Sequence, residues 1–264
     1  MIEKGIKIGY TDLRDIKGTV RKIKKYNWVY IGGEFCENLL DLYLNSYKAL
    51  SFFNGKKICF LTPIITEKNI PKLLKVLQNI LSVVPLDKFE VSVNDFGALN
   101  IIKKTFPNLI VNIGRHLAKH FFSFQKNAIK FHTEFSVIAG ISMNEIGIER
   151  YELSYFNLIP KNNFLEAKKK KVRFKFSMFY PYVLLSTTRT CLIGSKDIPP
   201  EQTIDEIRCL KECLFCDYFV KTYKIKEEMT VCENSTFIKL DYNEKLATRF
   251  SSLGVDRLIF CPRP

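Results

Sequence analysis

The amino-acid sequence predicts an α/β fold, and within that class a (β/α) barrel of the triosephosphate-isomerase type, complete or lacking some strands. Short apolar runs of strand length recur about every 20 to 40 residues along the chain. Segments with apolar side chains at helical spacing lie between several of these runs. Nine such runs in 264 residues exceed what a small doubly wound domain needs. We therefore predict one barrel domain over residues 1–264.

The predicted strands are rich in Ile, Val, Leu, Phe and Tyr, which pack well on a pleated surface. In chain order they cover residues 6–10, 28–32, 57–62, 89–94, 108–113, 128–132, 151–154, 172–178 and 256–261. Apolar residues at helical spacing predict helices over 39–47, 70–80 and 135–146. This alternation of strand and helix is typical of a parallel sheet with right-handed crossovers.

The alternation breaks between residues 187 and 242. This stretch contains Pro199-Pro200, only short apolar runs and a concentration of cysteines. We therefore predict a cysteine-bearing insertion around a site, near the C-terminal part of the barrel.

The composition limits the class of protein. Hydrophobic residues make up 47% of the chain and charged residues 26%, which is typical of a folded chain and excludes disorder for most of it. No apolar run approaches the roughly 18 residues of a membrane span, and the first residues lack the apolar core of a signal peptide. We therefore expect a cytoplasmic protein. The 41 Lys and Arg against 27 Asp and Glu give a net charge of +14, which is compatible with an RNA partner.

Eight cysteines in a chain without an export signal indicate metal binding rather than disulfides. Cys209, Cys213 and Cys216 lie within eight residues, and Cys191 lies 18 residues before Cys209. Thiolates bind zinc and iron–sulfur clusters alike. The two paired knuckles of a structural zinc site are missing, so the spacing favours an iron–sulfur cluster. Zinc, or thiols without a metal, are the alternatives.

Cys36 is a further candidate ligand, because it follows a predicted strand and the pair Gly32-Gly33. Paired glycines allow the backbone to approach a ligand, and barrels carry functional groups at the carboxyl ends of their strands. Cys59 lies inside a predicted strand and is interpreted as a small buried hydrophobic residue. Cys232 and Cys261 are weaker candidates.

Polar side chains follow several predicted strands. If they converge on the mouth of one barrel, they form a pocket for a small polar or anionic molecule, in which an arginine can bind a carboxylate through two hydrogen bonds. Each can equally cap a helix or bond to a loop. The candidate substrate-binding residues are Asn94, Asp95, Arg115, His132, Glu152 and Arg189. No dinucleotide fingerprint, P-loop or nucleophile elbow is present, which disfavours nucleotide-dependent and serine-hydrolase chemistry.

Six segments, taken in order, resemble peptidase family U-32, the collagenase-like peptidase family. They are Trp28–Gly33, Val93–Leu99, Phe131–Thr133, Asn144–Ser154, Ser186–Cys191 and Leu253–Leu258. The likeness covers nearly the whole chain. It is closest to the short members that act as accessory pairs in oxygen-independent ubiquinone biosynthesis.

This resemblance implies a barrel-like fold, a [4Fe–4S] cluster and oxygen-independent hydroxylation, with prephenate as the oxygen donor in related members. Cys36, Cys191, Cys209 and Cys213 match the cluster ligands of one partner in those pairs, and Cys216 is the alternative for the fourth position. A second family member as heterodimer partner is implied, with a homo-oligomer as the alternative. A peptidase, an accessory subunit, an RNA-base hydroxylation factor and a zinc-stabilised RNA-binding protein are the other functions that stay open.

Overall fold

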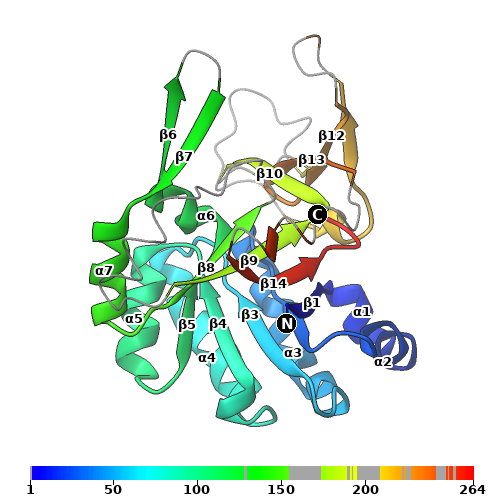
Figure 1. Cartoon of the computed structure of the whole chain (residues 1–264). Coiled ribbons are helices and arrows are strands. Elements are labelled where there is room, and N and C mark those ends of the chain that lie inside the picture. Colours follow the sequence, from blue (N-terminus) through cyan, green and yellow to red (C-terminus); the bar gives the residue numbers. More distant parts are fainter. Residues whose placement is uncertain are drawn as a thin grey trace.

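A computed structural model of the chain describes residues 2–127, 130–154, 174–188, 191, 193–194, 209–221, 223, 227–241, 248, 250–251 and 254–264, with the backbone alone for 122–127, 130–135 and 137. Eight parallel strands close into a barrel in the order β1-β14-β9-β8-β5-β4-β3-β2 (Figure 1). The predicted α/β barrel is therefore confirmed.

The predicted strands, with one exception, overlap the strands of the barrel. These are β1 (Glu3–Lys7), β2 (Trp28–Ile31), β3 (Lys57–Leu61), β4 (Phe89–Val93), β5 (Ile110–Ile113), β8 (Arg150–Ser154), β9 (Lys175–Tyr180) and β14 (Val255–Phe260). The α-helices are α1 (Tyr10–Arg14), α2 (Ile16–Ile23), α3 (Leu40–Ser46), α4 (Ile70–Leu81), α5 (Phe96–Thr105), α6 (Arg115–Ala118) and α7 (Val137–Glu145).

The helix α4 shows how the outer layer packs. Its first turn contains Pro71, which a helix tolerates there because the first N–H groups have no partner within the helix. Leu73, Val76, Leu77 and Ile80 repeat at helical spacing and are buried in the cluster between helices and strands. Burial of each such side chain contributes about 1.5–3 kcal/mol, so this face fixes the helix against the barrel.

The interior of the barrel combines an apolar cluster with an unusual number of polar side chains. Triosephosphate-isomerase-type barrels are usually filled with branched apolar side chains. Here Nη1 of Arg257 on β14 donates to Oε2 of Glu90 on β4 at 2.9 Å, and these two strands lie on opposite sides of the barrel. Such a bond has to cross the interior. Buried polar residues of the barrel strands are Lys7, Glu90, Ser92, Asn112, Arg150, Glu152, Ser177 and Arg257.

The predicted barrel strand over 128–132 is wrong. The described part of that segment belongs to an antiparallel hairpin of β6 (Phe122–Asn127) and β7 (Lys130–Phe135), while β5 pairs directly with β8. The hairpin follows β5 and projects from the barrel (Figure 1). The composition of a segment can predict a strand but not the strand with which it pairs. Here β7 pairs with the adjacent β6 and not with a barrel strand.

A second sheet follows β9. It contains β10 (Tyr182–Thr187), β11 (Tyr218–Val220), β12 (Met229–Cys232) and β13 (Ser235–Lys239), in the antiparallel order β10-β13-β12-β11. The connection from β9 places this sheet at the C-terminal end of the barrel, on the same side as the hairpin (Figure 1). Among the residues that the structure describes, no helix has the length and apolar character that crossing a membrane requires.

Candidate functional site

A cavity of about 250 Å³ lies at the C-terminal end of the barrel. The segments that follow β1, β2 and β14 line it, together with the β12–β13 turn and part of the cysteine segment. Barrel enzymes carry their active sites at this end. Its lining residues with a charge or a thiol are Lys7, Asp12, Lys22, Cys213, Cys232, Glu233 and Arg263.

A buried ion pair between Glu34 and Arg115 lies next to Lys7, one of the residues that line the cavity. Nε and Nη2 of Arg115 donate to the two carboxylate oxygens of Glu34 at 2.8 and 2.6 Å. The guanidinium also lies 4.2 Å from the ring centroid of Phe179. Burial raises the pKa of Glu34, but the charge and hydrogen bonds of Arg115 outweigh it and hold the pKa below its ordinary value. Arg115 therefore already has an internal carboxylate partner, and its contact with a substrate stays a prediction.

Lys7 brings a second cation to the same place. It ends β1, is 7% exposed and lines the cavity. Its Nζ lies 3.6 Å from Oε2 of Glu34 and makes no hydrogen bond with the described residues. The charge of Lys7 also acts against the effect of burial on the pKa of Glu233, so two carboxylates neighbour this ammonium group.

Glu233 and Arg263 also line the cavity. Glu233 begins the two-residue turn between β12 and β13 with φ at +54°, a conformation that residues other than glycine rarely adopt. Its partly buried carboxylate accepts a hydrogen bond from the backbone N of Phe35 at 3.3 Å, and burial raises its pKa. Arg263 donates to Asp217 at 2.8 Å and to the backbone oxygen of Cys213 at 2.7 Å, which fixes the cysteine segment beside the cavity.

The loop after β2 places Cys36. Gly32 has φ at +129°, and a Cβ atom there would lie 2.2 Å from the backbone oxygen of Leu61. Only glycine fits this approach of two neighbouring strands. The next turn closes with a hydrogen bond from the Cys36 backbone N to the Gly33 backbone oxygen at 3.2 Å. For Gly32 the structure therefore shows close packing against β3, and the predicted approach of the glycine pair to a ligand stays a prediction.

Cys36 and Cys213 each have other candidate cysteine ligands within electrostatic range. Burial raises the pKa of the Cys36 thiol, the charge of Glu233 adds to the increase, and Cys213 and Cys209 contribute less. Burial also raises the pKa of Cys213 to about 12, with a contribution from Glu233 and smaller ones from Cys191 and Cys209. Coulomb effects of this kind need short distances, so these thiols lie in one region of the molecule although they come from separate segments.

The other cysteines lie in different surroundings. Sγ of Cys216 donates to the backbone oxygen of Glu212 at 3.2 Å. Cys59 lies in the barrel interior with Cys261, among the apolar residues of β2, β3, β9 and β14, as the sequence predicts for Cys59. No group of three or more His, Cys, Asp or Glu side chains in the described part of the chain is arranged to hold a single metal ion.

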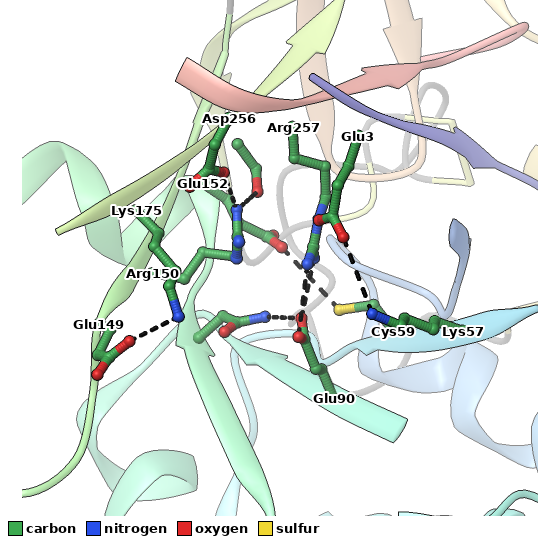
Figure 2. Close-up of polar contacts among 12 residues, drawn as sticks. Glu3, Lys57, Cys59, Glu90, Glu149, Arg150, Glu152, Lys175, Asp256 and Arg257 are labelled. Carbon is green, nitrogen blue, oxygen red and sulfur yellow. Dashed lines mark hydrogen bonds and ion pairs between the residues drawn. The ribbon is translucent and has the colours of Figure 1, made fainter. Parts of the chain in front are cut away.

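Glu152 is a fully buried acid in the barrel interior. Oγ of Ser92 donates to its Oε2 at 2.6 Å. Sγ of Cys59 lies 4.0 Å from its Oε1 (Figure 2). Burial raises its pKa to about 8, against the opposing effect of the Ser92 hydrogen bond. The carboxyl group therefore carries a proton at neutral pH and can donate as well as accept a hydrogen bond.

Asn94 and Asp95, two of the remaining candidate binding residues, bond to the backbone of neighbouring segments. Nδ2 of Asn94 donates to the backbone oxygen of Thr62 at 2.8 Å, so this residue ties β3 to the end of β4. Asp95 caps α5 by accepting from the Ala98 backbone N at 2.7 Å. His132 lies in the projecting hairpin, where the backbone alone is described, and Arg189 lies outside the described residues.

Sequence reasoning missed Lys7, Glu34 and Glu233. A signal existed for Lys7, because a lysine between Ile6 and Ile8 in a predicted strand is a charge among buried positions. Glu34 and Glu233 gave no comparable signal, since each lies in a turn where acidic residues are common.

No family model matches the chain, and no curated protein matches it.

Proposed function

We propose that the chain is an iron–sulfur protein in which Cys36, Cys191, Cys209 and Cys213 hold a [4Fe–4S] cluster at the mouth of the barrel. What supports this set is that Cys36 has Cys209 and Cys213 within electrostatic range and Cys213 has Cys191 and Cys209, although these thiols come from three separate segments. Four thiolates are the ligands that such clusters require. Each thiolate binds a different iron atom, so the four sulfur atoms lie farther apart than the ligands of a single metal ion.

The thiols can coordinate iron, and hydrogen bonds from Arg263 hold the turn that carries Cys213. Coordination deprotonates a thiol whatever its ordinary pKa, so the raised pKa of Cys36 and Cys213 is no obstacle to binding. Arg263 holds the backbone oxygens of Cys213 and Cys216 at 2.7 and 3.0 Å, which orients the turn that bears the ligands. A bound cluster supplies redox and electrophilic chemistry, which the protein tunes through burial and hydrogen bonds.

The finer part of the proposal is a role in oxygen-independent hydroxylation with a prephenate-type donor, as the resemblance to short members of peptidase family U-32 implies. The cavity beside Cys213 provides room for a small substrate, and Lys7 provides a positive charge. Glu152 provides a buried proton in the barrel interior, with a pKa of about 8.

A protein partner is part of the proposal. Large apolar side chains are exposed along the cysteine segment, with Leu210 63%, Phe215 77%, Phe219 67% and Tyr223 94% exposed. A concentration of exposed apolar groups is typical of a surface that binds another protein. We propose a second protein of the same family as that partner, in a heterodimer.

Cysteine substitutions test the ligand set. After anaerobic purification, Cys191→Ser and Cys213→Ser should reduce iron from about four atoms per chain to less than about one, because each removes one thiolate. Cys216→Ser and the buried control Cys59→Ser should keep their iron. Circular dichroism checks that each variant is folded. If Cys213→Ser keeps its iron and Cys216→Ser loses it, Cys216 is the fourth ligand in place of Cys213. Full iron in Cys191→Ser would refute the proposed set.

A further inference from the structure

The outer face of the helix α2 carries cations and no acid. The residues exposed at helical spacing along α2 and its C-cap are Lys17, Val20, Arg21 and Lys24. Thr19 and Ile23 are buried and hold the opposite face of the helix against the rest of the molecule. Figure 1 shows α1 and α2 (dark blue) on the outside of the barrel. The cationic face is therefore directed away from the core.

These cations have no carboxylate partner in the part of the chain that the structure describes. The acids nearest in sequence are already engaged. Oδ1 of Asp12 lies 2.8 Å from Nζ of Lys22, and Asp15 caps α2 by accepting from the Gly18 backbone N at 3.0 Å. Residues 16–33 contain five Lys or Arg and no acid. A surface that serves only solubility usually mixes both signs of charge, so this face is a candidate binding surface.

A second segment without acids lies beside the C-terminal end of α2. Nζ of Lys56 donates to the backbone oxygen of Lys24 at 2.9 Å, which fixes the turn that follows Phe52 against the end of the helix. Residues 47–57 contain three lysines and no acid. Phe52 is 59% exposed, and Val20 on α2 is 39% exposed. Exposed apolar side chains thus accompany the cations on both segments.

The charge and the exposed apolar groups together indicate the kind of partner. Cations attract a surface of phosphate groups, and an exposed aromatic side chain gains most where an apolar phase lies behind those phosphates. An anionic bilayer offers both, because its headgroup layer covers the acyl chains. A nucleic-acid duplex offers the phosphates without that apolar phase. The observations therefore favour a membrane surface over a nucleic acid.

We propose that this surface binds the headgroups of an anionic membrane. It is formed by Lys17, Val20, Arg21, Lys24 and Phe52. The three cations lie against the phosphate groups, and Phe52 reaches the boundary between headgroups and acyl chains. The contact is peripheral and depends on salt, because mobile ions screen the attraction. None of these five residues lines the cavity, so the membrane surface is separate from the candidate functional site and does not require the cluster.

Vesicle binding tests the proposal first. The full chain is mixed with vesicles of phosphatidylcholine, with or without about one third phosphatidylglycerol, and the bound fraction is measured by co-sedimentation. We expect binding to the anionic vesicles alone, at least about tenfold weaker as salt rises from about 0.05 M to about 0.5 M. Equal binding to both vesicles, or binding to neither, contradicts the proposal. Tighter binding to poly(U) RNA than to the vesicles, at equal phosphate concentration, would assign the surface to nucleic acid instead.

Charge substitutions then locate the surface. The triple variant Lys17→Gln, Arg21→Gln and Lys24→Gln should weaken vesicle binding at least about tenfold. Its matched control removes three surface cations that already have carboxylate partners, so the net charge changes equally. The control positions, each replaced by Gln, are Lys72, Lys175 and Lys221. The control should bind within about threefold of the wild type. An equal loss in both variants would show that net charge alone attracts the membrane. Circular dichroism checks that both are folded.

Phe52→Trp reports where the aromatic side chain lies. The native Trp28 is 3% exposed, so its emission is a constant background. With anionic vesicles the emission of the introduced indole should shift to shorter wavelength, because it leaves water. Phe96→Trp, at a position on α5 that is 53% exposed, is the matched control and should not shift. An unshifted Phe52→Trp, or equal shifts at both positions, would contradict the proposed orientation.

Discussion

The two ends of the barrel interior both bury charged side chains, but they differ in how completely these are paired. At the N-terminal end, Arg257 donates to Glu3 and Glu90 at 2.9 Å each (Figure 2). It also donates to Tyr30 at 2.7 Å. At the C-terminal end, Lys7 lies in the wall of a cavity without a hydrogen bond among the described residues. The thiols of the cysteine segment lie beside that same cavity.

We interpret the paired charges at the N-terminal end as stabilising the fold and the incompletely paired groups at the C-terminal end as part of a functional site. A buried charge is costly unless it is paired and hydrogen-bonded, so a fully paired network stabilises the fold once it has formed. Polar groups left without partners at the end where barrels bind their ligands indicate a site that a ligand completes. The predictions below test this contrast, from the largest expected effect to the smallest.

Loss of Arg257 should have the largest effect on stability. We expect Arg257→Met to lower the free energy of unfolding by about 3–5 kcal/mol, because Glu90 then keeps a buried charge without its cation. Urea denaturation measures this change. The matched control Arg14→Met, at an exposed position, should stay within about 0.5 kcal/mol of the wild type. A loss of less than about 1 kcal/mol in Arg257→Met would show that the network does not stabilise the barrel.

Glu152 should make stability depend on pH. Its pKa rises from 4.5 to about 8 on folding, so the folded state binds the proton more tightly than the unfolded state. The resulting stabilisation is fully present below pH 4.5 and is lost as the pH rises through about 8. The slope is at most about 1.4 kcal/mol per pH unit. His116, with a pKa lowered to about 4, acts in the opposite direction up to about pH 6.5, so the clearest window is pH 6.5 to 8.

Glu152→Gln isolates that contribution. The amide keeps the size and polarity of the acid without a titrating proton, so the variant should lose the fall in stability between pH 6.5 and 8, and its stability relative to the wild type should increase by about 2 kcal/mol over that window. The difference between variant and wild type removes the contribution of His116. Parallel stability curves for the two proteins would show that Glu152 is ionised at neutral pH.

An exposed ion pair should matter least. Nζ of Lys72 lies 2.8 Å from Oδ1 of Asp41, with side chains 30% and 49% exposed. We expect Lys72→Met to change the free energy of unfolding by no more than about 0.5 kcal/mol, because water and salt screen such a pair. A change as large as that of Arg257→Met would remove the distinction between buried and exposed charges.

The fold could be predicted from the sequence because its signals are local. Strand-length apolar runs and the amphipathic pattern of segments such as 70–80 follow directly from the period of each element. The pairing of β6 with β7 could not be predicted in this way, because strand composition does not specify a partner. The bidentate pair of Glu34 with Arg115 spans 81 residues and depends on closure of the whole barrel. The cysteines could be identified from the sequence because their clustering is local. The polar contacts of the barrel interior could not, because they join side chains from strands on opposite sides of the barrel.

Metal and sulfide analysis of the anaerobically purified wild-type chain tests the central claim most directly. The account predicts about four iron and four sulfide per chain, with the broad visible absorption of cysteine-bound clusters. Stoichiometric zinc without iron, or neither metal after anaerobic reconstitution with iron and sulfide, would contradict it.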